Sequence, residues 1–217
     1  YRAVKTAKSS LSILKKLGVD FTTLDEICCG SVMGRVGWSE KDLVEIYKRN
    51  VDAIKALGVK TLVLSCAGCY RMFKKEYPKH VEVPFEVLHM TEFLARQKLD
   101  LSPLGDVKVT YHDPCHLGRH CEVYEPPRQV IAQFPGVDFQ EMKYNRQFSH
   151  CCGGGGGVRA AYPEESAKIA DTRLDEADFA DVIITTCPFC VTNLGAQAKD
   201  RDVKVVDLVE LVDEHLQ

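Results

Sequence analysis

Cysteines in a recurring pattern are the residues of this chain best suited to chemistry. The more complete pattern is a single cysteine, a Cys-Cys-Gly run about 35 residues later, and a Cys-x-x-Cys pair about 35 residues after that. Its members are Cys115, Cys151, Cys152, Cys187 and Cys190. The first half of the chain carries a partial copy, made of Cys28, Cys29, Cys66 and Cys69. Because cysteine thiolates ligate metals, the two sets predict two metal sites.

Disulfide bridges are the alternative use of so many cysteines. Adjacent cysteines pair with one another only across a strained peptide, so two Cys-Cys runs argue against bridges. Two Cys-x-x-Cys pairs at matched places favour metal or redox chemistry in a reducing cytosol. Five thiolates exceed the four that tetrahedral zinc or a cubane iron–sulfur cluster normally takes, which predicts an unusual cluster or a spare thiol. The four-cysteine first set would also suit a closed zinc site.

Composition excludes several other classes of protein. The chain has 217 residues, 45% of them hydrophobic, which is ordinary for a globular protein with a real core. A net charge of −3 gives no footprint for nucleic acid. No apolar run is long enough to span a bilayer, so we expect a cytoplasmic protein that reaches a membrane only through a partner subunit.

An internal duplication organises the chain. The sequence GVDF occurs at residues 18–21 and 136–139, and the Cys-Cys-Gly runs, the Cys-x-x-Cys pairs and a closing strand–helix segment recur in the same order, offset by about 118 to 123 residues. We expect a first repeat over residues 1–97, a connector over 98–106 and a second repeat over 107–217. The first repeat's counterpart of Cys115 would fall before residue 1, so we also expect the natural chain to begin earlier.

The predicted fold is α/β, with two similar halves that each hold a small parallel sheet flanked by helices. The apolar runs 59–65 and 181–186 read as buried strands that end on the Cys-x-x-Cys pairs. A strand over 18–26 should lead into Cys28, and helices are expected over 2–17, 39–57, 127–134 and 163–177. Metal sites at strand carboxyl ends suit open α/β sheets. We expect the two sites to face one another across a substrate cleft between the halves.

Residues near the second set are candidates for supporting roles. Gly153 and Gly154 leave room for close approach and can donate backbone N–H groups to a cluster. His116 and His150 are candidate proton donors or hydrogen-bond partners of the cluster. His112 is an equally good candidate for a structural histidine. Arg119 and Arg159 could hold an anionic substrate, although solvated surface arginine is the simpler interpretation for either. Cys121 has no counterpart and is expected to be a plain thiol.

The segments HDPCHLGR and CCGGGGGVR, with the paired Cys-x-x-Cys motifs, resemble the cysteine-rich CCG domains of heterodisulfide reductase, closest to the type found in its D subunit. The resemblance implies a non-cubane [4Fe-4S] cluster in each complete set. Two such clusters would face a substrate disulfide, CoM–S–S–CoB in methanogens, and reduce it to two thiols. By motif match, the ligands of the second cluster would be Cys115, Cys151, Cys152, Cys187 and Cys190. Those of the first would be Cys28, Cys29, Cys66, Cys69 and one cysteine upstream.

The D-subunit type also carries a ferredoxin-like portion with four-cysteine motifs, which these residues lack. The resemblance therefore implies a ferredoxin-like domain or subunit as electron donor, with a membrane cytochrome or a flavoprotein as a further partner. Two other functions stay open from the residues alone. One is an electron-relay subunit of a dehydrogenase or of a quinone-linked or sulfite-reducing complex. The other is a zinc-stabilised interaction module without redox chemistry.

Overall fold

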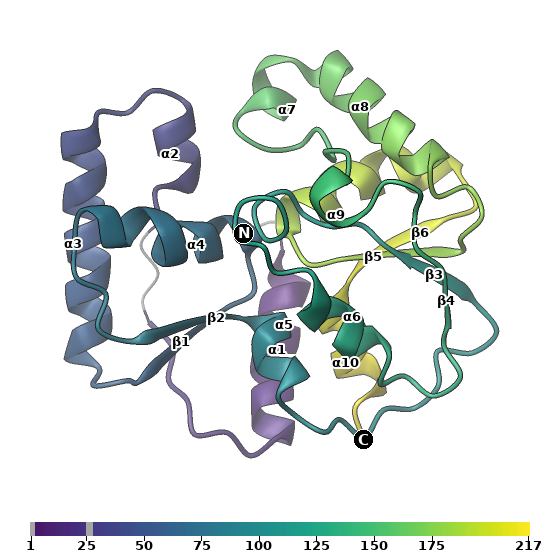
Figure 1. Ribbon diagram of the computed structural model, residues 1–217, viewed down its shortest axis with the longest axis horizontal. Helices are drawn as coiled ribbons and strands as arrows, with labels where there is room; N and C mark the ends of the chain where they lie inside the picture. The colour runs from purple at the N-terminus through teal and green to yellow at the C-terminus, as the bar shows by residue number, and fades with distance from the viewer. Residues whose placement is uncertain (1–2, 25–27) are drawn as a thin grey trace.

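A four-stranded parallel sheet forms the centre of the second half of the chain. The computed structural model describes residues 3–24 and 28–217, and Figure 1 shows their arrangement. The strand order is β4-β3-β5-β6, with bounds Lys108–Tyr111 (β3), Asp138–Phe139 (β4), Val182–Thr185 (β5) and Lys204–Asp207 (β6). Apolar β3 and β5 are central and buried, as expected for a parallel sheet covered on both faces.

A two-stranded parallel sheet lies in the first half. It joins β1 (Thr61–Leu64) to β2 (Glu86–His89). The strand predicted over residues 18–26 is wrong for residues 18–24, which form no strand, and residues 25–27 lie outside the described part. Their counterpart β4 is held only by pairing with β3. Within the described residues the first half has no strand equivalent to β3, so residues 18–24 have nothing to pair with.

Helices of the first half follow the predicted pattern closely. Their bounds are Val4–Lys16 (α1), Ser31–Arg35 (α2), Glu40–Ala56 (α3), Ala67–Arg71 (α4) and Met90–Ala95 (α5), with a π-helical turn at Met72–Glu76 and a 3₁₀ turn at Tyr77–Lys79. Helix α3 begins where the capping pattern predicts, because the Ser39 hydroxyl accepts the backbone N–H of Asp42.

Helices of the second half pack on both faces of its sheet. Their bounds are Glu125–Ile131 (α6), Val158–Ala161 (α7), Pro163–Asp175 (α8), Pro188–Gln197 (α9) and Leu208–His215 (α10), with 3₁₀ turns at Arg146–Phe148 and Ala198–Asp200. Pro163 stands in the first turn of α8, where its missing N–H costs nothing. Helix α6 begins two residues earlier and ends three residues earlier than predicted.

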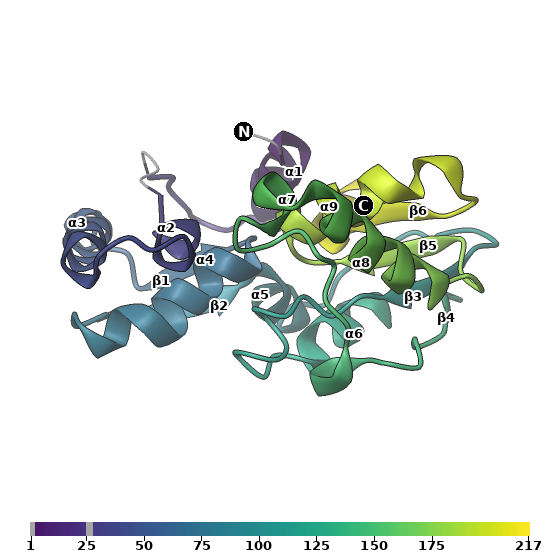
Figure 2. The ribbon, with the colours of Figure 1, turned by 90° about the horizontal axis from the view of Figure 1, so that it is seen from above.

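The two halves share their hydrophobic cores. One core joins Tyr70 and Tyr77 of the first half to Ile183 and Leu194 of the second. The other joins Ile13 of α1 and Met90 of α5 to the inner faces of the second half, where α1 packs along α10. Figure 2, seen from above, shows α1 beside the C-terminal part of the chain. Neither half therefore buries its apolar surface without the other.

A buried carboxyl group, that of Asp207, caps the start of α10. The Asp207 side chain is fully buried, and its Oδ1 accepts the Val209 N–H at 3.0 Å. Its Oδ2 has no hydrogen-bond partner among the described residues. Burial raises the pKa of Asp207 to about 8, because the charged form loses its hydration.

We predict that Asp207→Asn makes the fold more resistant to alkali. Between the ordinary pKa of about 4 and the raised one, folded wild-type protein binds a proton that the unfolded chain releases, so its stability falls as pH rises. Asparagine keeps the cap without a charge. Its advantage over wild type should therefore grow with pH, by on the order of 1 kcal/mol per pH unit. Urea unfolding at about pH 5 and about pH 8 measures this, and an equal difference at both would contradict it.

Candidate metal centre

The carboxyl ends of β1 and β5 carry the two Cys-x-x-Cys pairs. Cys66 follows β1 and caps α4, which contains Cys69. Cys187 follows β5 and caps α9, which contains Cys190. The predicted order of strand, cysteine pair and helix is confirmed in both halves. Backbone N–H groups at a helix start favour negative charge, so both pairs lie where thiolates are stabilised.

The two Cys-Cys runs lie in loops that buried side chains hold in place. In the second half, the Asn193 amide of α9 donates to the Cys152 carbonyl at 2.7 Å. In the first half, the Asn50 amide of α3 donates to the Cys28 carbonyl at 3.2 Å, and the Tyr77 hydroxyl donates to the Cys29 carbonyl at the same distance. Each loop is therefore anchored through its backbone, which leaves the sulfur atoms free for other partners.

All five cysteines predicted for the second site come together. Their thiols form a continuous set of neighbours that shift one another's pKa values, in the order Cys115, Cys151, Cys152, Cys190 and Cys187. Hydrogen bonds from Cys115 and then Cys152 lower the pKa of Cys151, and the Gly153 N–H adds a contact to its sulfur at 3.3 Å. The same hydrogen bond and burial raise the pKa of Cys115. The set thus favours one thiolate surrounded by thiols.

Three of the four cysteines of the first set also come together. The thiol of Cys69 contacts those of Cys29 and Cys66, and Cys29 is buried. Cys28 is exposed to solvent. Its counterpart Cys151 is exposed as well, but Cys66 and Cys69 are only partly buried whereas Cys187 and Cys190 are buried. The first site is therefore less enclosed than the second at its Cys-x-x-Cys pair.

The two sets meet at their Cys-x-x-Cys pairs. Cys66 and Cys187 occupy equivalent places in the two repeats, and their thiols lie in hydrogen-bonding contact. Hydrogen bonds from Cys187 and then Cys69 lower the pKa of Cys66. The expectation that the two cysteine sets face one another is thus confirmed. A substrate cleft between the halves stays a prediction.

His116 lies at this junction, whereas His150 does not. The Nδ1 atom of His116 is 3.4 Å from the place a Cβ would take on Gly68, between Cys66 and Cys69. Burial and then Arg35 and Arg71 lower its pKa to about 4, so it is a neutral N–H donor near pH 7. His150 is exposed at its ring, which stacks on Tyr144 and pairs with Glu176. The catalytic role of either histidine stays a prediction.

Two arginines that the sequence did not point to, Arg35 and Arg71, lie near the cysteines. Burial and then the like charge of Arg71 lower the pKa of Arg35, whose charge acts on Cys115 and Cys29. Both arginines line a cavity of about 340 Å³ beside the first set, together with Ser31, Tyr47 and Glu76. Arg35 also donates to the Ser31 hydroxyl at 2.8 Å. Both arginines belong to the first repeat, so nothing in the sequence indicated that they would lie near Cys115 of the second.

Arg119 and Arg159, the arginines named from sequence, hold loop backbone. Arg119 is exposed and donates to the carbonyls of Gln147 and Ser149. Arg159 is half-buried and donates to the Thr192 carbonyl at 2.9 Å. Their substrate role stays a prediction.

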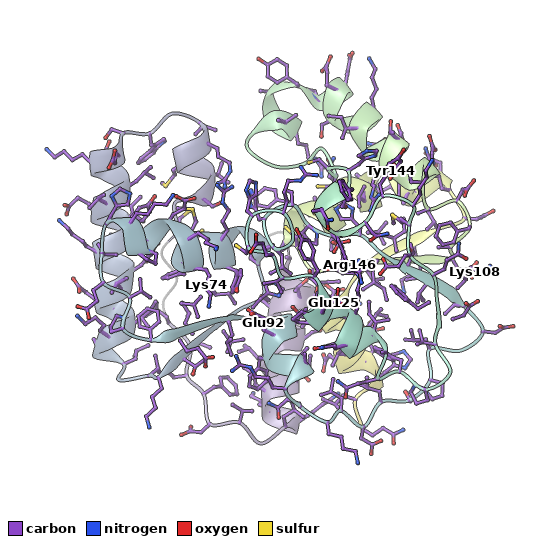
Figure 3. All side chains as sticks on the ribbon, viewed as in Figure 1. Lys74, Glu92, Lys108, Glu125, Tyr144 and Arg146 are labelled. Carbon is purple, nitrogen blue, oxygen red and sulfur yellow. The ribbon has the colours of Figure 1, made fainter. Side chains whose placement is uncertain are left out.

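Asp113, in the HDPC segment, is part of a buried ionic network. Both of its carboxylate oxygens accept from Arg128, at 2.8 and 2.9 Å, and one also accepts the Arg146 N–H. The Arg146 side chain extends this network to Glu125, as the labelled side chains in Figure 3 show. Since its oxygens are occupied, Asp113 shapes the loop that carries Cys115.

Gly153 and Gly154 allow the Cys-Cys loop to pack against α8 and α9. Gly153 has φ of +77°, and a Cβ there would lie 2.7 Å from the Ser166 carbonyl oxygen. A Cβ on Gly154 would lie 2.7 Å from the Asn193 Cβ. The space is thus filled by protein rather than open to substrate. Farther along the run, a Cβ on Gly157 would be 3.2 Å from Val36 of the first half.

We predict that Gly154→Ala disrupts the second site and that Gly155→Ala does not. The added methyl of the first variant would overlap Asn193, which anchors Cys152, whereas Gly155 has nothing within 4 Å of its Cβ position. Overpacking of this kind costs about 1–3 kcal/mol. Urea unfolding and the number of thiols that react with a thiol reagent measure it. Equal behaviour of the two variants would refute the packing role.

Fold and site together define an α/β protein with a duplicated cysteine cluster at its strand ends. The chain belongs to the cysteine-rich (CCG) domain family, whose model matches residues 1–74 and 109–195. The D subunit of the dihydromethanophenazine:CoB–CoM heterodisulfide reductase of Methanosarcina acetivorans is 43% identical over 98% of this chain and 55% of its own length.

More distant relatives belong to other oxidoreductases. The B subunit of a CoM/CoB fumarate reductase from Methanothermobacter marburgensis is 36% identical over 98% of this chain and 44% of its own length. The EtfAB:quinone oxidoreductase of Syntrophomonas wolfei is 35% identical over 97% of this chain and 32% of its own length. The chain thus spans about half the length, or less, of these relatives.

A solved structure shares the fold. The crystal structure of a hypothetical protein from Helicobacter pylori superposes with a TM-score of 0.64 at 15% identity, over 96% of this chain and 45% of that one. Among the described residues, none of the helices has the length and apolar character needed to cross a membrane.

Proposed function

We propose that these residues form the disulfide-reducing part of an iron–sulfur oxidoreductase subunit. The observation that carries the proposal is the contact between Cys66, which is partly buried, and Cys187, which is buried, because it brings the two cysteine sets to one place. A disulfide bound there would meet both sets at once. The names of the relatives, the D subunit of heterodisulfide reductase among them, support the same chemistry.

The residues of the second set fit a sulfur-liganded iron cluster. Five thiols converge, and one of them is already favoured as a thiolate. His112 adds a buried ring nitrogen without a hydrogen-bond partner in the described structure. Loop packing at Gly153 and Gly154 keeps Cys151 and Cys152 close to the others. We assign a non-cubane [4Fe-4S] cluster to Cys115, Cys151, Cys152, Cys187 and Cys190. The first set would hold a second cluster or zinc through Cys28, Cys29, Cys66 and Cys69.

Reduction of a disulfide consumes two electrons and two protons and yields two thiols. When bound, the cluster would supply electrons and iron that takes a sulfur as thiolate. The chain's own residues bind and orient the substrate. Arg35 and Arg71, the latter paired with Glu76 at 3.2 Å, would offer positive charge to an anionic substituent, and the His116 ring, next to Gly68 of the Cys66–Cys69 pair, would offer an N–H to a substrate sulfur. Burial of Cys187 and Cys190 would keep water from the sulfurs on the second side.

Electrons would enter from a ferredoxin-like domain or subunit, with a membrane cytochrome or flavoprotein further upstream. An electron-relay role is the second candidate function, since the named relatives include a fumarate reductase subunit and a quinone oxidoreductase. The relay requires one functional cluster and no turnover of a disulfide.

We predict that Cys66→Ser and Cys187→Ser each abolish disulfide reduction in the full-length protein. Loss of a residue that only supports a metal ligand usually lowers activity by about 10–100-fold. Loss of a ligand itself should cost more, so we expect the rate of disulfide reduction to fall by more than about 100-fold. Cys121→Ser is the matched control, because Cys121 stands outside the thiol set. The assay follows oxidation of a reduced dye by an asymmetric disulfide. Full turnover in both ligand variants would reject the proposal, and no turnover by wild-type protein that holds its clusters would favour the relay.

A second prediction concerns the substrate's charge. Arg35→Gln and Arg71→Gln should each raise KM for a disulfide with an anionic substituent by about 10–100-fold, the size of one charge-assisted hydrogen bond. A neutral disulfide should show no such change. Arg119→Gln tests the assignment made from sequence, and an effect on KM there alone would move the anion site to the second repeat.

A further inference from the structure

His112 is buried beside the second cysteine set, and its neighbours determine the role of each ring nitrogen. It lies just after β3 and is 1% exposed. A ring nitrogen of His112 and the sulfurs of Cys152 and Cys190 all lie within 4.8 Å of one another. The imidazole could ligate a metal together with the two sulfurs, or it could donate a hydrogen bond to sulfur instead. The partners of the two ring nitrogens distinguish these roles.

Arg173 of α8 donates a hydrogen bond to the Nδ1 atom of His112. Its Nε lies 3.0 Å from His112 Nδ1. A guanidinium has donors and no acceptor, so Nδ1 must present its lone pair and carry no proton. In a neutral imidazole the proton then lies on Nε2. Nε2 is also the nitrogen without a partner among the described residues, and thus the one left to serve the cysteines.

The guanidinium itself has no freedom to turn away. Arg173 is fully buried, and its other nitrogens donate to the Tyr144 carbonyl at 2.9 Å, to the Ser149 hydroxyl at 3.2 Å and to Glu176. Ligation of a metal by Nε2 would move the ring proton to Nδ1. Two donors would then oppose each other 3.0 Å apart, in a place that water does not reach.

We propose that Arg173 fixes the tautomer of His112 so that its Nε2–H donates to the second cysteine set, and that His112 is not a metal ligand. The inference rests on the proposed function, in which this set holds an iron–sulfur cluster. An N–H donor makes a cluster sulfur less basic and stabilises the reduced, more negative state. His112 therefore raises the reduction potential of the second cluster, and Arg173 positions it to do so.

The counterpart of Arg173 in the first repeat is a different residue. The offset of 123 residues that aligns the two Cys-Cys-Gly runs also aligns the buried positions of α3 with those of α8. Asn50 takes the place of Arg173, and its amide donates to the Tyr77 hydroxyl at 2.8 Å and to the Cys28 carbonyl. On the proposed function, this difference would give the two clusters different potentials.

The test uses full-length protein purified without oxygen and labelled with ¹⁵N-histidine. Pulsed EPR of the second cluster should show only the weak ¹⁵N coupling of a hydrogen-bonded ring, and this coupling should vanish in His112→Phe. A strong coupling, typical of imidazole bound to iron, would overturn the proposal whether or not any variant folds.

Redox titration followed by EPR supplies the second measurement. The potential should shift to more negative values in His112→Phe and stay near that of wild type in His112→Gln, whose amide can accept from Arg173 and donate to sulfur. His215→Gln is the control, since its ring pairs with Ser102. An unchanged potential in a His112→Phe protein that keeps its cluster would overturn the donor role.

A preparation that takes up zinc alone separates the two claims. It would refute the proposed iron–sulfur function. X-ray absorption would then still decide the role of His112, because a sulfur-only shell supports the donor and a nitrogen in the shell overturns it.

Discussion

The contact between Cys66 and Cys187 is the constraint on which the rest of the structure depends. These thiols come from different halves, yet they meet at a largely enclosed place where hydrogen bonds favour a thiolate on Cys66. A negative sulfur away from water needs a cation or several donors nearby. The helix starts at both pairs, the arginines beside the first set and a bound metal would each supply this. The cores shared between the halves hold the contact in place, so a change that loosens α1 from α10 should also affect the cysteines.

Duplication makes the two cysteine sets similar, and a few side chains make them different. The second set is complete within the chain and is surrounded by the buried pairs Asp113–Arg128 and His112–Arg173. In the first, Cys66 and Cys69 are only partly buried, and an asparagine stands where the second half has Arg173. The charged cavity with Arg35 and Arg71 lies on the first side. Under the proposed function, the first side would bind the substrate's charge and the second would set a potential.

Local patterns in the sequence were sufficient for much of the fold. Ser39 capped its helix, Pro163 began another, and the apolar runs before Cys66 and Cys187 formed strands, because each depends on residues a few places apart. The predicted strand failed over residues 18–24 because a strand needs a partner, which a local sequence pattern does not reveal. Arg35 escaped notice for the same reason, since its relation to Cys115 exists only after the halves meet. The bond between His112 and Arg173 likewise joins residues 61 places apart.

The central claim is that the two cysteine sets hold iron–sulfur clusters at which a disulfide is reduced. The most direct test is the iron, zinc and acid-labile sulfide content of full-length protein purified without oxygen, with EPR recorded across a redox titration. The account predicts iron and sulfide together, and an EPR signal that a thiol product alters when it binds. Zinc alone, with no sulfide even after anaerobic reconstitution, would contradict it and leave a metal-stabilised structural module.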